Sequence, residues 1–419
     1  MNKVSLELPL SGCSAHKRYY IVSLFAIYSF GSMFFGNPQF AIGQLFYLFI
    51  GIALSVVMLS SGKIYIHVFN VFDIIFVLYC FFQTLVIPST HRASSMAAVF
   101  SMIVSSILFF CIYNLVVRHS LFYSFMKSYM FGVFLIGIII LYNNMHNISV
   151  GNRLQRYNNP ELFGVFIAAA TWVGLWMAIG FSLCLYLYYK KNNRKLIVLG
   201  LFFLTIVILS GTRKLILFLC IVICSIFYVR NPKKWLMKSI LLIPVLFLLY
   251  LAVMNIQLFY DTFGWRLNLS IHIFWGQTNI TADFSMFERA FMIESAREFW
   301  QERPLFGQGI HSFHLHLGMR THPHNNFWDL LHSTGIIGFM IYYARYVYFM
   351  YATVGLYLRD REKNREALFF TGLIIALLSI QWWQHVFTSR SFTIIYLIVA
   401  LYLHQAKRRD MHSAYIKAT

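Results

Sequence analysis

The side chains best suited to chemistry lie in residues 322–338, where a long polar segment runs into an apolar one. An imidazole (His324), an amide (Asn325) and a carboxylate (Asp329) stand together there, where water would meet lipid. An imidazole exchanges its proton near neutral pH, so His324 is a candidate general acid or base. Asp329 could orient an imidazole, although a local ion pair explains it equally well. A proton-transfer group at that depth suits chemistry on a lipid-carried substrate whose head group lies at the membrane surface.

Arginine and lysine side chains beside apolar segments form a second candidate group. Arg213 and Lys214 end the sequence Ser-Gly-Thr-Arg-Lys at 210–214, between the apolar runs 196–209 and 215–229. This pattern predicts a tight helical pair with two cations at its outer end. Cations at that depth are costly unless they neutralise an anion or line water, although snorkelling to lipid head groups is the other explanation.

Arg289 lies on the apolar side of an amphipathic helix that the spacing predicts over 286–303. At 100° per residue the opposite, solvated face carries Glu288, Glu294, Ser295, Glu298 and Glu302. A cation on an apolar face needs a wet cavity or an anionic partner, and a loop carboxylate is the simpler partner.

Three further arginines of outer segments are weaker candidates: Arg153, Arg156 and Arg266. Arg266 also fits an interfacial anchor, because it directly follows a predicted span. If several of these arginines converge, they form a diphosphate clamp, since guanidinium binds phosphate oxygens through two parallel hydrogen bonds.

Five histidines crowd into a short stretch: His311, His314, His316, His322 and His324. Two His-x-His pairs invite a metal, yet neither has the spacing of a helical zinc site and no cysteine lies nearby. Loop histidines are more often polar surface groups, so we expect no metal and no other cofactor.

The composition predicts an all-α polytopic membrane protein. The chain has 419 residues, of which 59% are hydrophobic and 11% charged, and a mean hydropathy of +0.66. About twelve transmembrane helices of roughly 20 apolar residues each fit this profile. Their expected centres lie near residues 28, 50, 77, 107, 135, 175, 203, 222, 247, 346, 374 and 397.

The distribution of charge predicts the orientation. Most of the 34 lysines and arginines fall in segments that share one side when both termini are cytoplasmic. The net charge of +20 is therefore mainly a topology signal, and no nucleic-acid partner is expected. The chain forms a single membrane domain, 1–419, with a large periplasmic loop at about 255–325. Asp73 is a lone carboxylate in the middle of a span, too little for an obvious proton relay.

Several motifs of this chain, taken together, resemble the O-antigen ligase/polymerase (Wzy_C) superfamily. His324-Asn325, followed by Gly335 and Gly338, resembles its His-Asn…Gly-x-x-Gly signature. Residues 304–309, Pro-Leu-Phe-Gly-Gln-Gly, resemble its Pro-Leu-x-Gly-x-Gly element. Looser likenesses are residues 210–213 to its Ser-Arg motif, Arg289 with Trp300 to its Arg…Trp pattern, and Asn159-Pro160 to a short Asn-Pro motif. The resemblance covers a core of about 200–340.

The resemblance implies a GT-C-like fold and metal-independent transfer of a glycan from an undecaprenyl-diphosphate carrier in the bacterial inner membrane. His324 would be the general base, and Arg213 and Arg289 would offset the charge of the leaving diphosphate. Substrate contacts would come from Arg266, Arg320, Asn325, Lys214, Arg153 and Arg156. The expected partners are the lipid-linked glycan donor and acceptor and the lipid bilayer; a chain-length regulator and a flippase could join them.

The resemblance leaves two functions open, polymerase and ligase, and a transporter is the alternative from another class of protein. The run from His324 to Gly338, with Arg213-Lys214, looks more like a polymerase of O-antigen or a related surface polysaccharide. An O-antigen ligase would use the same donor with lipid A-core as acceptor. A flippase or secondary transporter would also have many spans with buried arginines, but it would more often carry two similar halves, which this sequence lacks.

Overall fold

The structure is a computed structural model. It describes residues 15–34, 41–60, 62–87, 92–145, 158–159, 165–166, 170–274, 284–313, 317, 322–384, 387 and 390–418.

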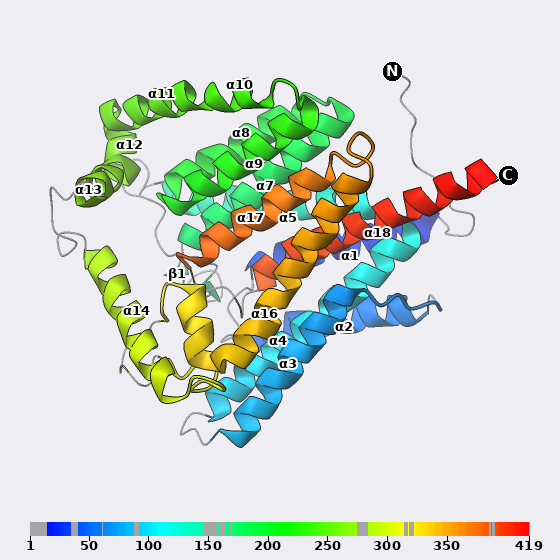
Figure 1. The fold of residues 1–419 in the computed structure, drawn as a ribbon, viewed down its shortest axis with the longest axis horizontal. Helices are drawn as coiled ribbons and strands as arrows, with labels where there is room; N and C mark the ends of the chain where they lie inside the picture. The colour runs from blue at the N-terminus through cyan, green and yellow to red at the C-terminus, as the bar shows by residue number, and fades with distance from the viewer. Residues whose placement is uncertain are drawn as a thin grey trace.

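Helices make up nearly all of the part that the structure describes (Figure 1). In chain order they are α1 (Ala15–Phe34), α2 (Ala41–Leu59), α3 (Val68–Val86), α4 (Arg92–His119), α5 (Phe122–Asn143), α7 (Ala170–Lys191), α8 (Lys195–Leu209), α9 (Lys214–Arg230), α10 (Trp235–Ile240), α11 (Leu242–Asn255), α12 (Gln257–Phe259), the π-helix η1 (Tyr260–Gly264), α13 (Trp265–Phe274), α14 (Phe284–Glu302), α16 (Asn326–Arg359), α17 (Ala367–Gln381) and α18 (Arg390–Ala418). Two two-residue strands, β1 (Asn158–Asn159) and β2 (Val165–Phe166), pair antiparallel. The prediction of an all-α protein is confirmed, and each expected helix centre lies within a helix.

Among the residues that the structure describes, four helices are long and apolar enough to cross a bilayer: α3, α4, α5 and α7. Leu45–Leu59 of α2, α8 and α17 are apolar but shorter. These helices are those of a membrane protein, because apolar surface of this length requires a hydrocarbon environment. The number of twelve spans and their orientation stay predictions.

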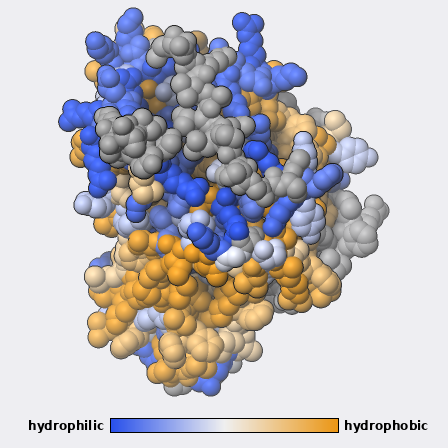
Figure 2. Space-filling view, turned by 90° about the vertical axis from the view of Figure 1, so that its right-hand side faces the viewer, coloured by the Kyte–Doolittle hydropathy of each residue, from blue (hydrophilic) through white to orange (hydrophobic). Residues whose placement is uncertain are grey.

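The surface of the molecule also fits a membrane protein. Figure 2 shows a broad hydrophobic area below a hydrophilic one on a single face. Helix α2 contributes large exposed side chains to the protein surface, among them Leu48, Phe49 and Val56. A soluble monomer rarely leaves a contiguous apolar surface of such extent open to water.

The helices that matter for the candidate site pack around α16. Helix α17 packs against both α16 and α9, α14 packs against α16, and α3 covers another side of α16. Figure 1 places the end of α17 beside the start of α16, with α14 on the same side of the bundle. Helices α10 to α13 form an arm that leads from α9 toward that side (Figure 1). Segments distant in sequence therefore meet at one end of the bundle.

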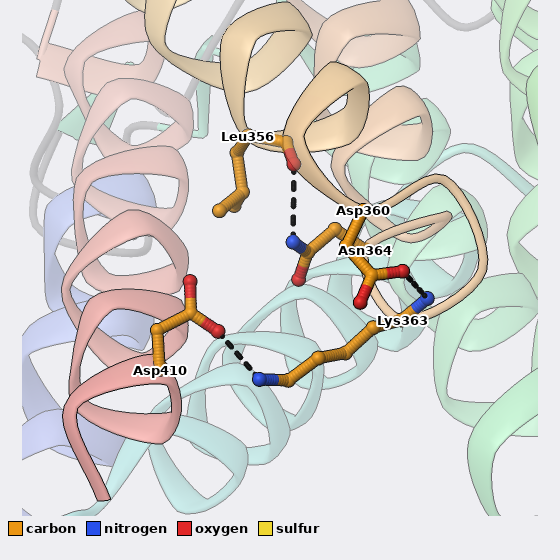
Figure 3. Close-up of polar contacts among 5 residues, drawn as sticks. All are labelled: Leu356, Asp360, Lys363, Asn364 and Asp410. Carbon is orange, nitrogen blue, oxygen red and sulfur yellow. Dashed lines mark hydrogen bonds and ion pairs between the residues drawn. The ribbon is translucent and has the colours of Figure 1, made fainter. Parts of the chain in front are cut away.

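Polar contacts stabilise the turn that joins the end of α16 to the start of α17, far from the candidate site (Figure 3). The Asn364 amide donates to the carbonyl of Leu356 at 3.0 Å, and the backbone N–H of Lys363 donates to the Asp360 carboxylate at 2.9 Å. The Lys363 ammonium also pairs with Asp410 of α18 at 2.7 Å. These contacts fix the turn between α16 and α17, so both helices present their other ends to the site in a defined position.

Candidate active site

The turn between α8 and α9 is as tight as its sequence predicts. Ser210 caps the end of α8 and its hydroxyl donates to the Val207 carbonyl at 2.7 Å. Gly211 follows with a φ of 63°, a left-handed conformation that glycine adopts without steric strain. The chain then re-enters a helix at Lys214, with Arg213 half-buried just before it. The predicted helical pair with two cations at its end is confirmed.

Lys214 joins this turn to two other helices. Its ammonium donates to the Trp383 carbonyl at 3.3 Å and to the side-chain carbonyl of Gln384, both directly after α17. It also lies within electrostatic range of the Arg289 guanidinium on α14. Lys214 and Arg289, hereafter the cation pair, carry charges of the same sign and therefore repel each other. An anion bound between them would relieve that repulsion.

Helix α14 holds Arg289 by burying one side. Met292 and Ala296 are fully buried and pack with Phe313, and Trp328 of α16 lies against this cluster. The predicted amphipathic helix is confirmed, with bounds Phe284–Glu302 in place of 286–303. The placement of Ser295 on the solvated face is wrong: Ser295 is buried, and its hydroxyl donates to the Phe291 carbonyl at 3.0 Å, which satisfies it without water.

His324 lies two residues before the first residue of α16, with an exposed side chain. The next residue, Asn325, is the N-cap, and its side-chain oxygen accepts from the backbone N–H groups of Phe327 at 3.0 Å and Trp328 at 3.2 Å. Any substrate contact of Asn325 would therefore come from its amide nitrogen. Asp329 is buried, and its carboxylate accepts from the Ser333 hydroxyl at 3.4 Å. The Asn325 cap fixes the backbone directly after His324 and so limits where the imidazole can lie.

A buried amide network connects this helix start to the end of α17. Asn326 donates to the side-chain oxygen of Gln381 at 3.0 Å, and its own oxygen accepts from the backbone N–H of Phe387 at 2.8 Å. Tyr343 donates to the same Gln381 oxygen at 2.8 Å. Phe387 comes three residues after Gln384, the partner of Lys214. His324 and the cation pair are therefore tied to the same short segment after α17.

Helix α16 breaks at Gly335, and the loop 304–309 fills the break. Gly335 has φ 64° and ψ −172°, which interrupts the helical hydrogen bonds. The loop replaces them: Ile336 N–H donates to the Pro304 carbonyl at 2.9 Å, and Gln308 N–H donates to the His332 carbonyl at 2.7 Å. Gln83 of α3 adds a donor to the Ser333 carbonyl at 2.6 Å. The two motifs that resemble the superfamily thus form one structural unit, which holds α14 against α16.

Substituting Gly307 should open this unit. A Cβ at Gly307 would meet the Gly335 backbone nitrogen at 2.5 Å, and the residue has a φ of 72°. We expect Gly307→Ala to destabilise the protein by about 2–4 kcal/mol, because backbone atoms must move. Thermal unfolding of the purified protein measures this. Gly355→Ala, in open space within α16, is the control and should be neutral or stabilising. Equal melting temperatures for the two variants would contradict the close packing.

Some predicted residues lie outside the part that the structure describes. Arg153, Arg156, Arg320, His314 and His316 are among them, and so is the side chain of Arg266, whose backbone belongs to α13. His311 and His322 are described, with ring centroids 4.8 Å apart. Across the described residues, no group of three or more histidine, cysteine, aspartate or glutamate side chains has the arrangement of a metal site.

A second charged pair was not foreseen from the sequence. Arg345 of α16 lies 3.7 Å from Asp73 of α3, and its guanidinium lies over the Tyr342 ring at 3.9 Å and the Tyr396 ring at 4.5 Å. The pair borders a cavity of about 20 Å³, room for one water molecule. Asp73 alone was noticed in the sequence. The signal that could have revealed Arg345 as the partner of Asp73 is its position as a lone cation inside the tyrosine-rich run of α16.

This buried pair should couple strongly. Arg345→Leu leaves a buried carboxylate without its cation, so we expect a loss of about 3–5 kcal/mol. The double variant Asp73→Asn, Arg345→Leu should lose clearly less, because neither charge remains buried alone. Thermal unfolding of the two single variants and the double variant tests this. Additive losses would show that the two side chains do not act as a pair.

The fold and the site define a helical membrane protein that has a pair of cations and a histidine just before the start of α16. A family model named Wzy_C and described as O-Antigen ligase matches residues 198–343. This match supports the resemblance to the O-antigen ligase/polymerase superfamily over these residues. The match contains the α8–α9 turn, α14, the loop 304–309 and the start of α16. No curated protein matches the chain.

Proposed function

We propose that this protein polymerises undecaprenyl-diphosphate-linked oligosaccharide repeat units of O-antigen or a related surface polysaccharide. The observation that carries the proposal is the cation pair, Lys214 beside Arg289, tied through residues 381–387 to the helix start at His324. Two cations that repel each other fit a diphosphate between them. A histidine nearby fits proton transfer from a sugar hydroxyl.

The reaction follows from these groups. An acceptor hydroxyl attacks the anomeric carbon of the donor glycan with inversion, and His324 takes the hydroxyl proton as general base. The bond between the anomeric carbon and the diphosphate oxygen breaks, and undecaprenyl diphosphate leaves with the bonding electrons. Arg213 and Arg289 offset the charge that develops on it. The cations take the place that a metal ion has in other glycosyl transfers, so the reaction needs no cofactor.

The remaining contacts are assigned by the chemistry of the side chains. Lys214 joins the diphosphate contacts, while Arg266, Arg320, Arg153 and Arg156 bind phosphate or sugar from the outer segments. We place the reaction on the periplasmic side of a bacterial inner membrane, with both termini cytoplasmic, because the lysine and arginine bias favours that orientation.

O-antigen ligase is the second candidate function, and the description of the matching family model favours it. A ligase would use the same donor and transfer the finished glycan to lipid A-core. The two functions share the donor and differ in the acceptor.

A deletion strain separates the two functions. Loss of a polymerase should leave lipid A-core that bears a single repeat unit. Loss of a ligase should leave lipid A-core without repeats while polymer accumulates on the lipid carrier. Normal long-chain polysaccharide in the deletion strain would contradict both.

A further inference from the structure

Gln384 lies beside Lys214 of the cation pair, although the sequence does not indicate it as a candidate residue. It follows α17 and is 4% exposed. Its side-chain oxygen accepts from the Lys214 ammonium. Its amide nitrogen has no hydrogen-bond partner among the residues that the structure describes. A buried donor of this kind is rare in a folded protein and calls for an explanation.

The orientation of the Gln384 amide is fixed by charge. An ammonium has only donors, so it must face the amide oxygen and not the amide nitrogen. The nitrogen therefore faces away from the ammonium, and turning the amide over would set two donors against each other. Lys214 thus holds Gln384 in the one orientation that leaves its N–H groups without a hydrogen-bond partner among the described residues.

Three of the groups gathered here can donate hydrogen bonds to an anion. The Lys214 ammonium and the Arg289 guanidinium are cations in electrostatic range, and Gln384 adds a neutral amide donor beside Lys214. A phosphoryl oxygen can accept from all three kinds of donor, and its charge is attracted by both cations. A sugar hydroxyl would satisfy the amide but would leave the repulsion between the cations.

We propose that Gln384 is a further substrate-binding residue, whose amide nitrogen donates to a phosphoryl oxygen of the lipid diphosphate held by Lys214 and Arg289. This inference rests on the proposed function and adds a residue from the end of α17 to the site. It also explains why the segment after α17 is anchored on two sides, by Lys214 through Gln384 and by Asn326 through Phe387.

Two substitutions separate a substrate contact from a mere support of Lys214. Gln384→Glu keeps an oxygen for Lys214 but loses the donor and adds a negative charge. Gln384→Met, of similar length, loses both the acceptor and the donor. If Gln384 only orients Lys214, the glutamate variant, which keeps an oxygen for Lys214, should lose less pyrophosphate affinity than the methionine variant. If it binds the phosphate, both variants should fail, the glutamate variant at least as badly.

The experiment uses the full-length protein purified in lipid nanodiscs, with inorganic pyrophosphate as the binding probe. We expect pyrophosphate to raise the melting temperature of wild type and of Gln405→Glu, a control in α18. The concentration needed should rise roughly 10- to 100-fold in Gln384→Glu and Gln384→Met. Wild-type response in Gln384→Glu would overturn the inference, whatever Gln384→Met does.

Kinetics then relate this contact to the reaction. With a lipid-diphosphate oligosaccharide as donor, KM should rise in both Gln384 variants by a factor similar to the loss of pyrophosphate affinity. If wild type binds pyrophosphate but transfers no glycan, the proposed function fails while the Gln384 contact stands. If wild type transfers glycan and the Gln384 variants match its KM and its pyrophosphate response, the contact alone fails.

Discussion

Arg289→Gln is expected to lower the rate of glycosyl transfer by a factor on the order of 10²–10³. The substitution removes one cation of the cation pair, so the leaving diphosphate develops its charge with less compensation. The rate of Arg289→Lys should fall between those of wild type and Arg289→Gln, because lysine keeps the charge but lacks the paired donors of guanidinium. Initial rates of the purified variants with a lipid-diphosphate donor measure both.

The same helix provides the control for this prediction. Arg297 lies on the exposed side of α14, where its guanidinium is 3.8 Å from Glu294 and its side chain is 53% exposed. Arg297→Gln should leave the rate unchanged, because exposed pairs of this kind contribute little. Equal losses of transfer rate in Arg289→Gln and Arg297→Gln would mean that the positive charges of α14 matter only for folding. Full activity of Arg289→Gln would remove Arg289 from the site.

His324→Ala should lower turnover by a factor on the order of 10²–10⁴, the usual contribution of a general base. Folding should be unaffected, because the side chain is exposed and the cap of α16 belongs to Asn325. Turnover at saturating donor, together with the melting temperature of each variant, measures the effect.

His322→Ala is the matched control, since it removes an imidazole two residues away that the proposed reaction does not use. It should keep nearly full turnover. Comparable losses in the two variants would assign the effect to the histidine-rich segment as a whole, and full turnover of His324→Ala would exclude it as the base.

The helices and the candidate turn could be predicted from the sequence because their signals are local. Apolar runs of suitable length mark the helices, and residues 210–214 end one run and begin the next within five positions. His324 stood out because a titratable group directly precedes an apolar helix. The amphipathic period of α14 likewise predicts Arg289 on the less exposed side of the helix, where it is half-buried.

The missed features depend on contacts between segments far apart in the chain. Nothing near Gln384 in the sequence points to Lys214, and the two meet because α17 packs against α9. Arg345 finds Asp73 through the packing of α16 on α3. The burial of Ser295 was missed for a related reason: a helical period gives the direction of a side chain but not the extent of the neighbouring cluster.

The role of the loop 304–309 was also beyond local reasoning. The local sequence shows only that the loop contains glycines, whereas in the structure Gly307 packs against Gly335 so closely that a Cβ has no room. The loop supplies the hydrogen bonds that the break in α16 leaves open. The way the loop aligns with α16 explains both Gly307 and Gly335, and this alignment exists only in the folded chain.

Polymerisation is tested most directly with the purified protein in nanodiscs and one defined undecaprenyl-diphosphate oligosaccharide, in the presence of a chelator and without lipid A-core. We predict a ladder of longer oligosaccharides on the lipid carrier, lost in Arg289→Gln and in His324→Ala. Transfer that occurs only after lipid A-core is added, with no ladder on the carrier, would contradict polymerisation and identify a ligase.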